Sequence, residues 1–279
     1  MSVPEGSGRS IGAAEAAAFR DAGLPASSPD PAAFVNRYSI DLVVEIELVM
    51  HGRGGQTRER TIRAATKVID GRVFSIGRLL SPEYLRDMTV LMMENEDRGQ
   101  DAFIFMPSLD KVRRITTAQR SDAFFGSDVT YEDIEQQRAD DFEIDSLEEI
   151  QHNGELAYRI GARPARRGNY ARVVFVVAKA DNAMLESGYY KRGADEPYRV
   201  IESPRSGMVQ MGGHILPTRF RVENRARGTR TEVERRKTAI AEKRSFGIEP
   251  TPDEVQALLY IQMVAAGVPT KDELGPPPD

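Results

Sequence analysis

The feature that most constrains the fold is an alternation of apolar and polar residues with a period of two. In the stretch DLVVEIELVMH, residues 41–51, every second side chain is apolar and falls on one side of an extended chain: Leu42, Val44, Ile46, Leu48 and Met50. The other side carries three acidic residues and a histidine beside two valines. A strand with one apolar face and one mostly polar face is typical of an antiparallel sheet.

The same alternation continues along the chain, interrupted by turns such as GRGG at residues 52–55. About eleven or twelve segments have the pattern of strands. After residues 41–51 they are residues 58–69, 86–95, 101–107, 111–116, 141–150, 156–164, 171–179, 184–192, 198–203, 216–226 and 229–237. No long helical pattern separates them, which excludes a doubly wound parallel sheet. We expect a mainly β fold built on one large, curved antiparallel sheet.

The chain divides by composition into three segments. Residues 1–30 are rich in Gly, Ser, Pro and Ala and predict a loosely held lead-in, and residues 31–247 form the β domain. In residues 248–279, Thr251 and Glu254 form a capping box that opens an apolar helix, and a tail follows. Packing of this helix on the protein's own sheet is favoured, and docking onto a partner protein is the alternative.

Composition excludes several classes of function. The net charge of −5 and the sequence pI near 5.5 argue against a general affinity for nucleic acid. The absence of cysteine excludes disulfides, thiol catalysis and thiolate metal sites. No apolar run reaches the roughly 18 residues of a membrane span. The N-terminus lacks the pattern of a secretion signal, so the protein either stays in the cytosol or has had a leader removed.

No pattern in the chain predicts catalysis. The three histidines, His51, His152 and His214, are far apart and lack metal-ligand spacing. Ser127 lies in FFGSDV, without the Gly-x-Ser-x-Gly context of a nucleophile and without a histidine nearby. No glycine loop of the phosphate-binding type is present. We therefore expect no enzyme activity, no metal and no cofactor.

One long motif carries a resemblance. DAFIFMPSLDKVRRITTAQRSDAFFGSDVTYEDIE, residues 101–135, resembles the signature of the LolA-like outer-membrane lipoprotein-sorting proteins. The positions that match in order are Met106, Pro107, Lys111, Arg113, Arg114, Ile115, Phe124, Gly126, Ser127, Asp128, Thr130, Tyr131, Glu132 and Asp133. Ala123 stands where the family usually has serine, and Val129 where it has an aromatic residue.

The resemblance implies a LolA/LolB-like half-barrel of antiparallel strands around an apolar cavity, with short lid helices. Such proteins are periplasmic or belong to the cell envelope, are often linked with inner-membrane exporters of the resistance-nodulation type, and are thought to carry lipid or lipid-modified proteins. We therefore expect a soluble envelope carrier without catalytic activity. The alternatives are a structural or adaptor subunit whose barrel is filled by its own side chains and which docks through the C-terminal helix, and, less favoured, a hydrolase of lipid-like substrates.

Two groups of residues are candidates for the site. The expected cavity wall consists of inward-facing apolar residues, each of which could equally be plain core: Val44, Ile46, Leu48, Met50, Met88, Val90, Met92, Val174, Val176, Phe220 and Val222. The motif predicts a latch between sheet and lid, in which aromatic rings plug the sheet and Ser127 or Asp128 caps the short helix that follows. Its arginines are expected to pair with Asp122, Asp128, Glu132 or Asp133. The latch residues are Met106, Pro107, Arg113, Arg114, Arg120, Phe124, Phe125, Gly126, Ser127, Asp128, Tyr131 and Asp133. The alternative is that these arginines bind a lipid phosphate.

Overall fold

Strands dominate the structure, a computed structural model that describes residues 42–69, 72–95, 99–135, 137, 141–165, 168–211 and 214–240. Thirteen of the described strands belong to one antiparallel sheet, and two more form a separate ribbon. The predicted mainly β, antiparallel class is confirmed. The lead-in at residues 1–30 and the helix and tail at residues 248–279 lie outside the described residues.

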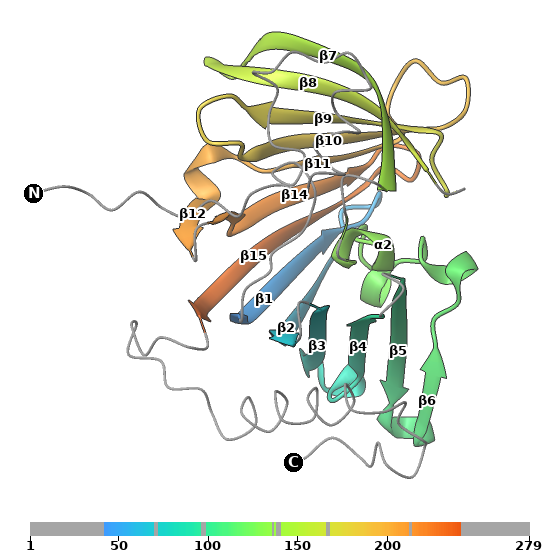
Figure 1. Ribbon diagram of the computed structural model, residues 1–279. Coiled ribbons are helices and arrows are strands. Elements are labelled where there is room, and N and C mark those ends of the chain that lie inside the picture. The colour runs from blue at the N-terminus through green and yellow to red at the C-terminus, as the bar shows by residue number, and fades with distance from the viewer. Residues whose placement is uncertain are drawn as a thin grey trace, which may run out of the picture. The chain divides into compact units, whose positions relative to one another are not determined.

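The chain forms two compact units, which are taken one at a time. Unit 2 comprises residues 38–136 and 230–279, and its strand order is β6-β5-β4-β3-β2-β1-β15 (Figure 1). Its strands are β1 (Leu42–His51), β2 (Thr57–Ile69), β3 (Arg72–Ser81), β4 (Thr89–Glu94), β5 (Gln100–Met106), β6 (Lys111–Arg114) and β15 (Thr229–Ile240). Short helices join or follow them: η2 (Glu83–Leu85), η3 (Pro107–Leu109), η4 (Thr117–Gln119), η5 (Phe124–Gly126) and α2 (Tyr131–Ile134).

Local sequence explains most of these elements. The alternation in residues 41–51 becomes β1, and the GRGG turn closes the β1–β2 hairpin with Gly55 at a φ of +79°. Strand β3 is missing from the strands that the sequence predicts. Its sequence, RVFSIGRLLS, places apolar residues on both faces, because Val73 and Leu79 are buried as well as Phe74 and Ile76. A strand buried on both sides has no period-two pattern to detect.

Unit 1 comprises residues 1–37 and 137–229, and its sheet has the order β14-β11-β10-β9-β8-β7. Its elements are β7 (Phe142–His152), β8 (Glu155–Pro164), β9 (Arg172–Ala178), β10 (Met184–Tyr190), β11 (Arg199–Glu202), η7 (Arg205–Gly207), β12 (Met208–Met211), β13 (His214–Pro217) and β14 (Arg219–Asn224). Its core has two parts, one centred on Phe142, Ile160 and Phe175 and the other on Val176 and Leu185.

The prediction of a single strand at residues 216–226 is wrong. The chain leaves the β12–β13 ribbon after Pro217 and enters the main sheet as β14 at Arg219. Between them, the backbone N–H of Thr218 donates to the carbonyl of Gly207 at 2.5 Å, and the Thr218 hydroxyl donates to the same carbonyl at 2.7 Å. Because the N–H of Thr218 is bonded to Gly207, it cannot continue the hydrogen-bond ladder of a strand, so one apparent strand becomes two.

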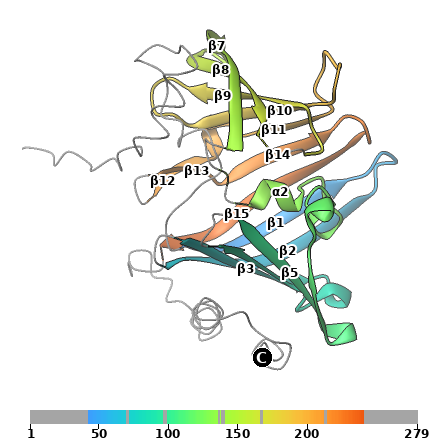
Figure 2. The same ribbon diagram turned by 45° about the vertical axis from the view of Figure 1, so that its right-hand side comes forward.

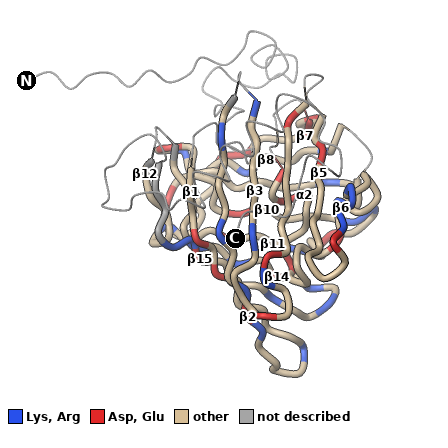
Figure 3. The backbone as a smooth tube through the Cα atoms, turned by 90° about the horizontal axis from the view of Figure 1, so that it is seen from below, with Lys and Arg blue, Asp and Glu red and all other residues tan. Residues whose placement is uncertain are grey.

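Charges of both signs are mixed along the described strands (Figure 3). In β2, for example, Arg58, Glu59 and Arg60 follow one another directly. The described part of the chain has no helix long and apolar enough to cross a bilayer.

Candidate functional site

The strongest candidate site is one face of the unit 2 sheet, which we call the covered face. Residues paired directly across antiparallel strands project from the same side, so the register defines the face. Leu48 lies between Val233 and Arg60, and Ile62 pairs with Leu79. The covered face is the side of the sheet that carries these residues; it includes Leu48 and Met50 of β1, Arg60 and Ile62 of β2, Leu79 of β3, Val90 and Met92 of β4, and Thr231 and Val233 of β15.

The unit 2 members of the expected cavity wall gather on this face. Val44, Ile46, Leu48 and Met50 lie on it in β1, and Val90 and Met92 join them from β4. All but Ile46 are buried, and Ile46 is partly buried. Met88 precedes β4 and is also partly buried.

The unit 1 members do not share one face. Val222 pairs with Ile201, Ile201 with Ser187, and Ser187 with Phe175. Val174 and Val176 flank Phe175 in β9 and therefore project from the opposite side of the unit 1 sheet. Phe220 lies two residues before Val222 in β14 and belongs to the side of Val222. Within unit 1, these residues line two surfaces.

The motif residues after β6 form a covering segment, residues 117–135, which lies on the covered face. Phe124, Phe125 and Tyr131 are buried, and the Phe124 ring contacts both others at centroid distances of 4.4 and 5.6 Å. Phe125 and Gly126 take φ values of +49° and +77°, so the chain turns sharply between the rings. Figures 1 and 2 show α2 against β1, β2 and β15.

Hydrogen bonds within the covering segment fix its turns. Thr130 caps α2 by accepting from the backbone N–H of Asp133, whose carboxylate accepts from Thr130 in return, at 2.7 Å. The sequence predicted Ser127 or Asp128 as this cap, which is wrong. The Ser127 hydroxyl instead donates to the carbonyl of Phe124 at 2.7 Å and accepts from the Val129 N–H at 3.2 Å. A hydroxyl used in this way holds a turn and is not prepared as a nucleophile.

One buried pair ties the covering segment to the sheet. The backbone N–H of Asp128 donates to the Thr231 hydroxyl at 2.9 Å, and that hydroxyl donates to the Asp128 carboxylate, also at 2.9 Å. Thr231 is fully buried and pairs with Met50, so the tether stands on the covered face itself. No pattern in the sequence predicts the role of Thr231, because 103 residues separate the two partners.

The arginines of the motif pair with other acids than those expected. Arg120 contacts the carboxylate of Glu135 at 3.0 Å and donates to the carbonyl of Gln100 at 2.7 Å, which ties the end of the covering segment to the start of β5. Arg114 pairs with Asp101 across the edge of the sheet. Arg113 is exposed, as is Pro107, while Met106 is partly buried at the end of β5.

The electrostatics of this site favour neutral groups. Burial raises the pKa of Tyr131 above its ordinary value, and the negative charge of Asp122 adds to the effect, so the phenol keeps its proton. Among the described residues, no cluster of His, Asp and Glu side chains could hold a metal ion. The arrangement offers apolar surface with a tethered cover.

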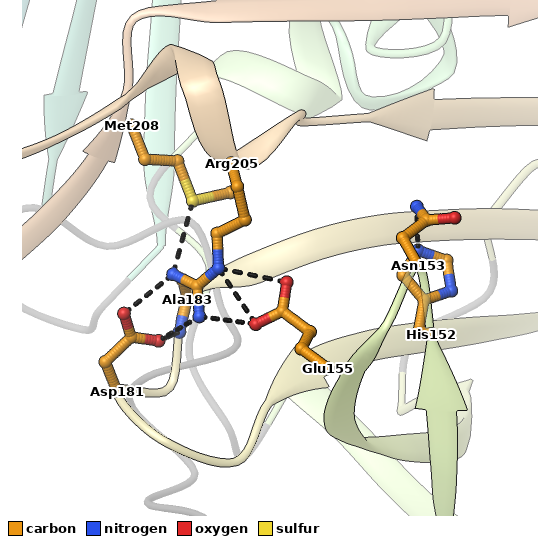
Figure 4. Close-up of polar contacts among 7 residues, drawn as sticks. All are labelled: His152, Asn153, Glu155, Asp181, Ala183, Arg205 and Met208. Atoms are coloured by element: carbon orange, nitrogen blue, oxygen red, sulfur yellow. Dashed lines mark hydrogen bonds and ion pairs between the residues drawn. The ribbon is translucent and has the colours of Figure 1, made fainter.

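A second polar cluster, which was not predicted from the sequence, lies in unit 1 (Figure 4). Arg205 of η7 donates to Glu155 at 2.7–3.0 Å and to Asp181 at 2.6–2.9 Å. The hydrogen bond from Arg205 lowers the pKa of Asp181, and both carboxylates raise that of Arg205. The cluster joins the residues before the β12–β13 ribbon to the start of β8 and to the β9–β10 turn.

His152 and Asn153, also drawn in Figure 4, belong to a turn and not to this cluster. His152 and Asn153 close the β7–β8 hairpin, where Asn153 and Gly154 both have positive φ. The amide nitrogen of Asn153 lies 3.1 Å from Nε2 of His152. The geometry of the Arg205 cluster is that of a structural clamp, because each donor of its guanidinium fork meets a carboxylate.

Comparisons with known proteins show the family of the chain and its fold. A family model described as “uncharacterized protein” matches residues 71–245, more than half of the chain. The chain belongs to this family. No curated protein matches it.

Solved structures share the fold of this family member. A domain from Vibrio parahaemolyticus, named as a candidate outer membrane lipoprotein-sorting protein domain, has a TM-score of 0.68 at 18% identity over 80% of this chain and 92% of that one. A DUF1329 family protein from Desulfovibrio piger has a TM-score of 0.67 at 22% identity, covering 76% and 88%. A LolA superfamily protein from Nitrosomonas europaea has 0.59 at 17%, covering 75% and 90%. The resemblance carried by the motif is thereby confirmed at the level of fold.

Proposed function

We propose that this protein is a carrier of lipid or lipid-modified protein in the cell envelope, and that the covered face of unit 2 receives the apolar chain. The observation that carries the proposal is the covered face itself, with its row of Leu, Ile, Val and Met side chains under a short segment. The fold shared with a candidate lipoprotein-sorting domain supports it. An inner-membrane exporter as partner, and the periplasm as compartment, are part of the proposal.

Energetics favour a carrier over a catalyst for such a surface. Burying an acyl chain of about 15 methylenes is worth about 12 kcal/mol against water, at about 0.8 kcal/mol per methylene. A chain taken from a bilayer was already shielded from water, so its free energy of transfer is close to zero only if the receiving surface is equally apolar. Met50 and Met92 suit chains of varied shape, because methionine is unbranched and adapts to irregular gaps.

The proposal requires the covering segment to move, because Leu48, Ile62 and Leu79 are at most 2% exposed. The segment is small and is joined to β15 by the Asp128–Thr231 pair, so it is the element whose displacement would uncover the face. The chain has no cysteine, which makes a disulfide lock easy to interpret. The Thr231 hydroxyl lies 2.9 Å from the Asp128 nitrogen, which keeps the two Cα atoms within the about 6.8 Å that a disulfide spans.

The test uses the full chain with Asp128→Cys and Thr231→Cys together. We expect the reduced protein to bind the neutral fluorescent probe Nile red, and the oxidised protein to bind it at least about tenfold more weakly, which corresponds to about 1.4 kcal/mol. Native mass spectrometry with solvent extraction of the unmodified protein should show co-purifying lipid. If the protein is empty and neither redox form binds the probe, the face is filled by its own side chains and the adaptor function replaces the carrier.

A further inference from the structure

Arg60 is a buried arginine on the covered face, and the carrier function does not explain it. Its side chain is 6% exposed, and it projects from the covered face because Arg60 pairs with Leu48. A guanidinium placed among apolar side chains is costly unless its donors are paired with acceptors. The contacts of Arg60 therefore decide whether the residue has a structural role.

These contacts leave the cation without a counter-ion. One terminal nitrogen donates to the backbone carbonyl of the neighbouring Glu59 at 2.8 Å, while the buried Nε has no hydrogen-bond partner. Within the part of the chain that the structure describes, no carboxylate pairs with it. Glu83, which precedes Tyr84 in the chain, binds Arg86 at 2.7 Å, and Asp128 bonds to Thr231 of the covered face.

The aromatic ring that contacts Arg60 is exposed and free to rotate away from it. The Tyr84 ring centroid lies 5.8 Å from the guanidinium carbon, a cation–π contact, and Tyr84 itself is 75% exposed. A ring so exposed is not held by core packing, so its rotation would uncover the guanidinium without disturbing the sheet. Tyr84 thus stands between Arg60 and solvent.

The covered face is also polarised along its length. In β2 the residues on this face run from Arg60 to Val68, and Val68 pairs with Val73 of β3. At that end the carboxylate of Glu94 in β4 accepts a hydrogen bond of 3.0 Å from the backbone N–H of Val73. Eight residues of strand separate the two ends, or about 27 Å at 3.4 Å per residue. The buried guanidinium and the buried carboxylate therefore lie at opposite ends of the covered face.

We propose that Arg60 binds the anionic headgroup of an amphiphile whose apolar chain lies on the covered face. This inference rests on the proposed function and adds the class of cargo: a chain that ends in a phosphate or carboxylate, with the headgroup at the Arg60 end. A planar guanidinium suits either anion, because its fork of donors matches two oxygens at once.

The experiment compares three ligands with the same apolar chain: hexadecyl phosphate, hexadecanoate and hexadecanol. Each competes with Nile red on the full-length protein and on Arg60→Gln and Arg60→Lys. Arg192→Gln is the control, because Arg192 is exposed, belongs to unit 1 and is not part of the covered face. We expect the unmodified protein and the control to prefer an anionic ligand over hexadecanol by about ten- to a hundredfold.

Arg60→Gln should lose that preference while binding hexadecanol as before, and Arg60→Lys should keep part of it. The anionic ligand that wins shows whether a phosphate or a carboxylate is the natural group. The ligand-free Arg60→Gln protein should unfold at the same or a higher temperature, because a buried unpaired charge has been removed. A wild-type protein that binds anionic and neutral ligands equally, or a variant that keeps the preference, overturns this inference and leaves the carrier function standing. A wild-type protein that binds none of the three overturns the carrier function itself.

Discussion

Replacing Thr231 by valine tests how firmly the covering segment is tied to the sheet. The change keeps the shape of the side chain and removes the hydroxyl that accepts from the Asp128 N–H and donates to its carboxylate. A bond between neutral groups is worth about 0.5–1.5 kcal/mol and one to a charged group about 1.5–3 kcal/mol. Both partners are buried, so water does not replace the lost bonds, and we expect a loss of about 2–4.5 kcal/mol.

Two measurements check this value. Urea denaturation gives the change in free energy of unfolding, and hydrogen exchange at the Asp128 amide reports local opening of the covering segment. Thr231→Ser is the control, because it keeps the hydroxyl and loses only a methyl group, at about 1 kcal/mol. If valine and serine destabilise the protein equally, the hydroxyl contributes nothing and the tether is not what holds the covering segment.

Three further changes have clear expectations. Arg205→Met should destabilise the protein by about 1–2 kcal/mol, a modest value because the three side chains are about one third exposed. Since Arg205 lowers the pKa of Asp181, the stabilisation is present above the unfolded carboxylate pKa of about 3.9. In urea titrations it should be lost as the pH falls through the lower pKa of the folded state. Gly126→Ala should lower the free energy of unfolding by about 1–2 kcal/mol in thermal unfolding, because an L-residue is strained at a φ of +77° even though the space around it is open. Gly77→Ala is the control and should leave that free energy unchanged, because its new methyl would meet Ile62 at 3.5 Å, an ordinary contact distance. Deleting residues 251–267 should make the protein aggregate if the apolar helix predicted there packs on the sheet, and a monomeric, stable product in light scattering would favour a docking role instead.

The sequence predicts the parts of the fold that depend on local pattern. Strand β1 is found because one of its faces is apolar and the other mostly polar, whereas β3 escapes because Val73 and Phe74 are buried on opposite sides. The aromatic cluster of the covering segment is found through its motif, and the rings of Phe124 and Tyr131 do meet.

The sequence does not predict features that depend on register or on distant partners. Val174 and Val222 look alike as apolar strand residues, but the pairing through β10 and β11 places them on opposite faces of unit 1. Thr231 and Arg60 are ordinary polar positions in alternating strands, and only tertiary structure makes one a tether and the other a buried cation. Neither the composition nor the spacing of residues indicates these two roles.

The pairing of β1 with β15 has a consequence for how the polypeptide is made. Strand β1 lies at the beginning of the described chain and β15 at its end, with every described strand of unit 1 between them. While a ribosome is still translating, β1 presents a row of unpaired amides and carbonyls that invites pairing with another nascent molecule. Completion of unit 2 must therefore wait until β15 has been synthesised, and a chaperone that shields this edge would raise the yield of native protein.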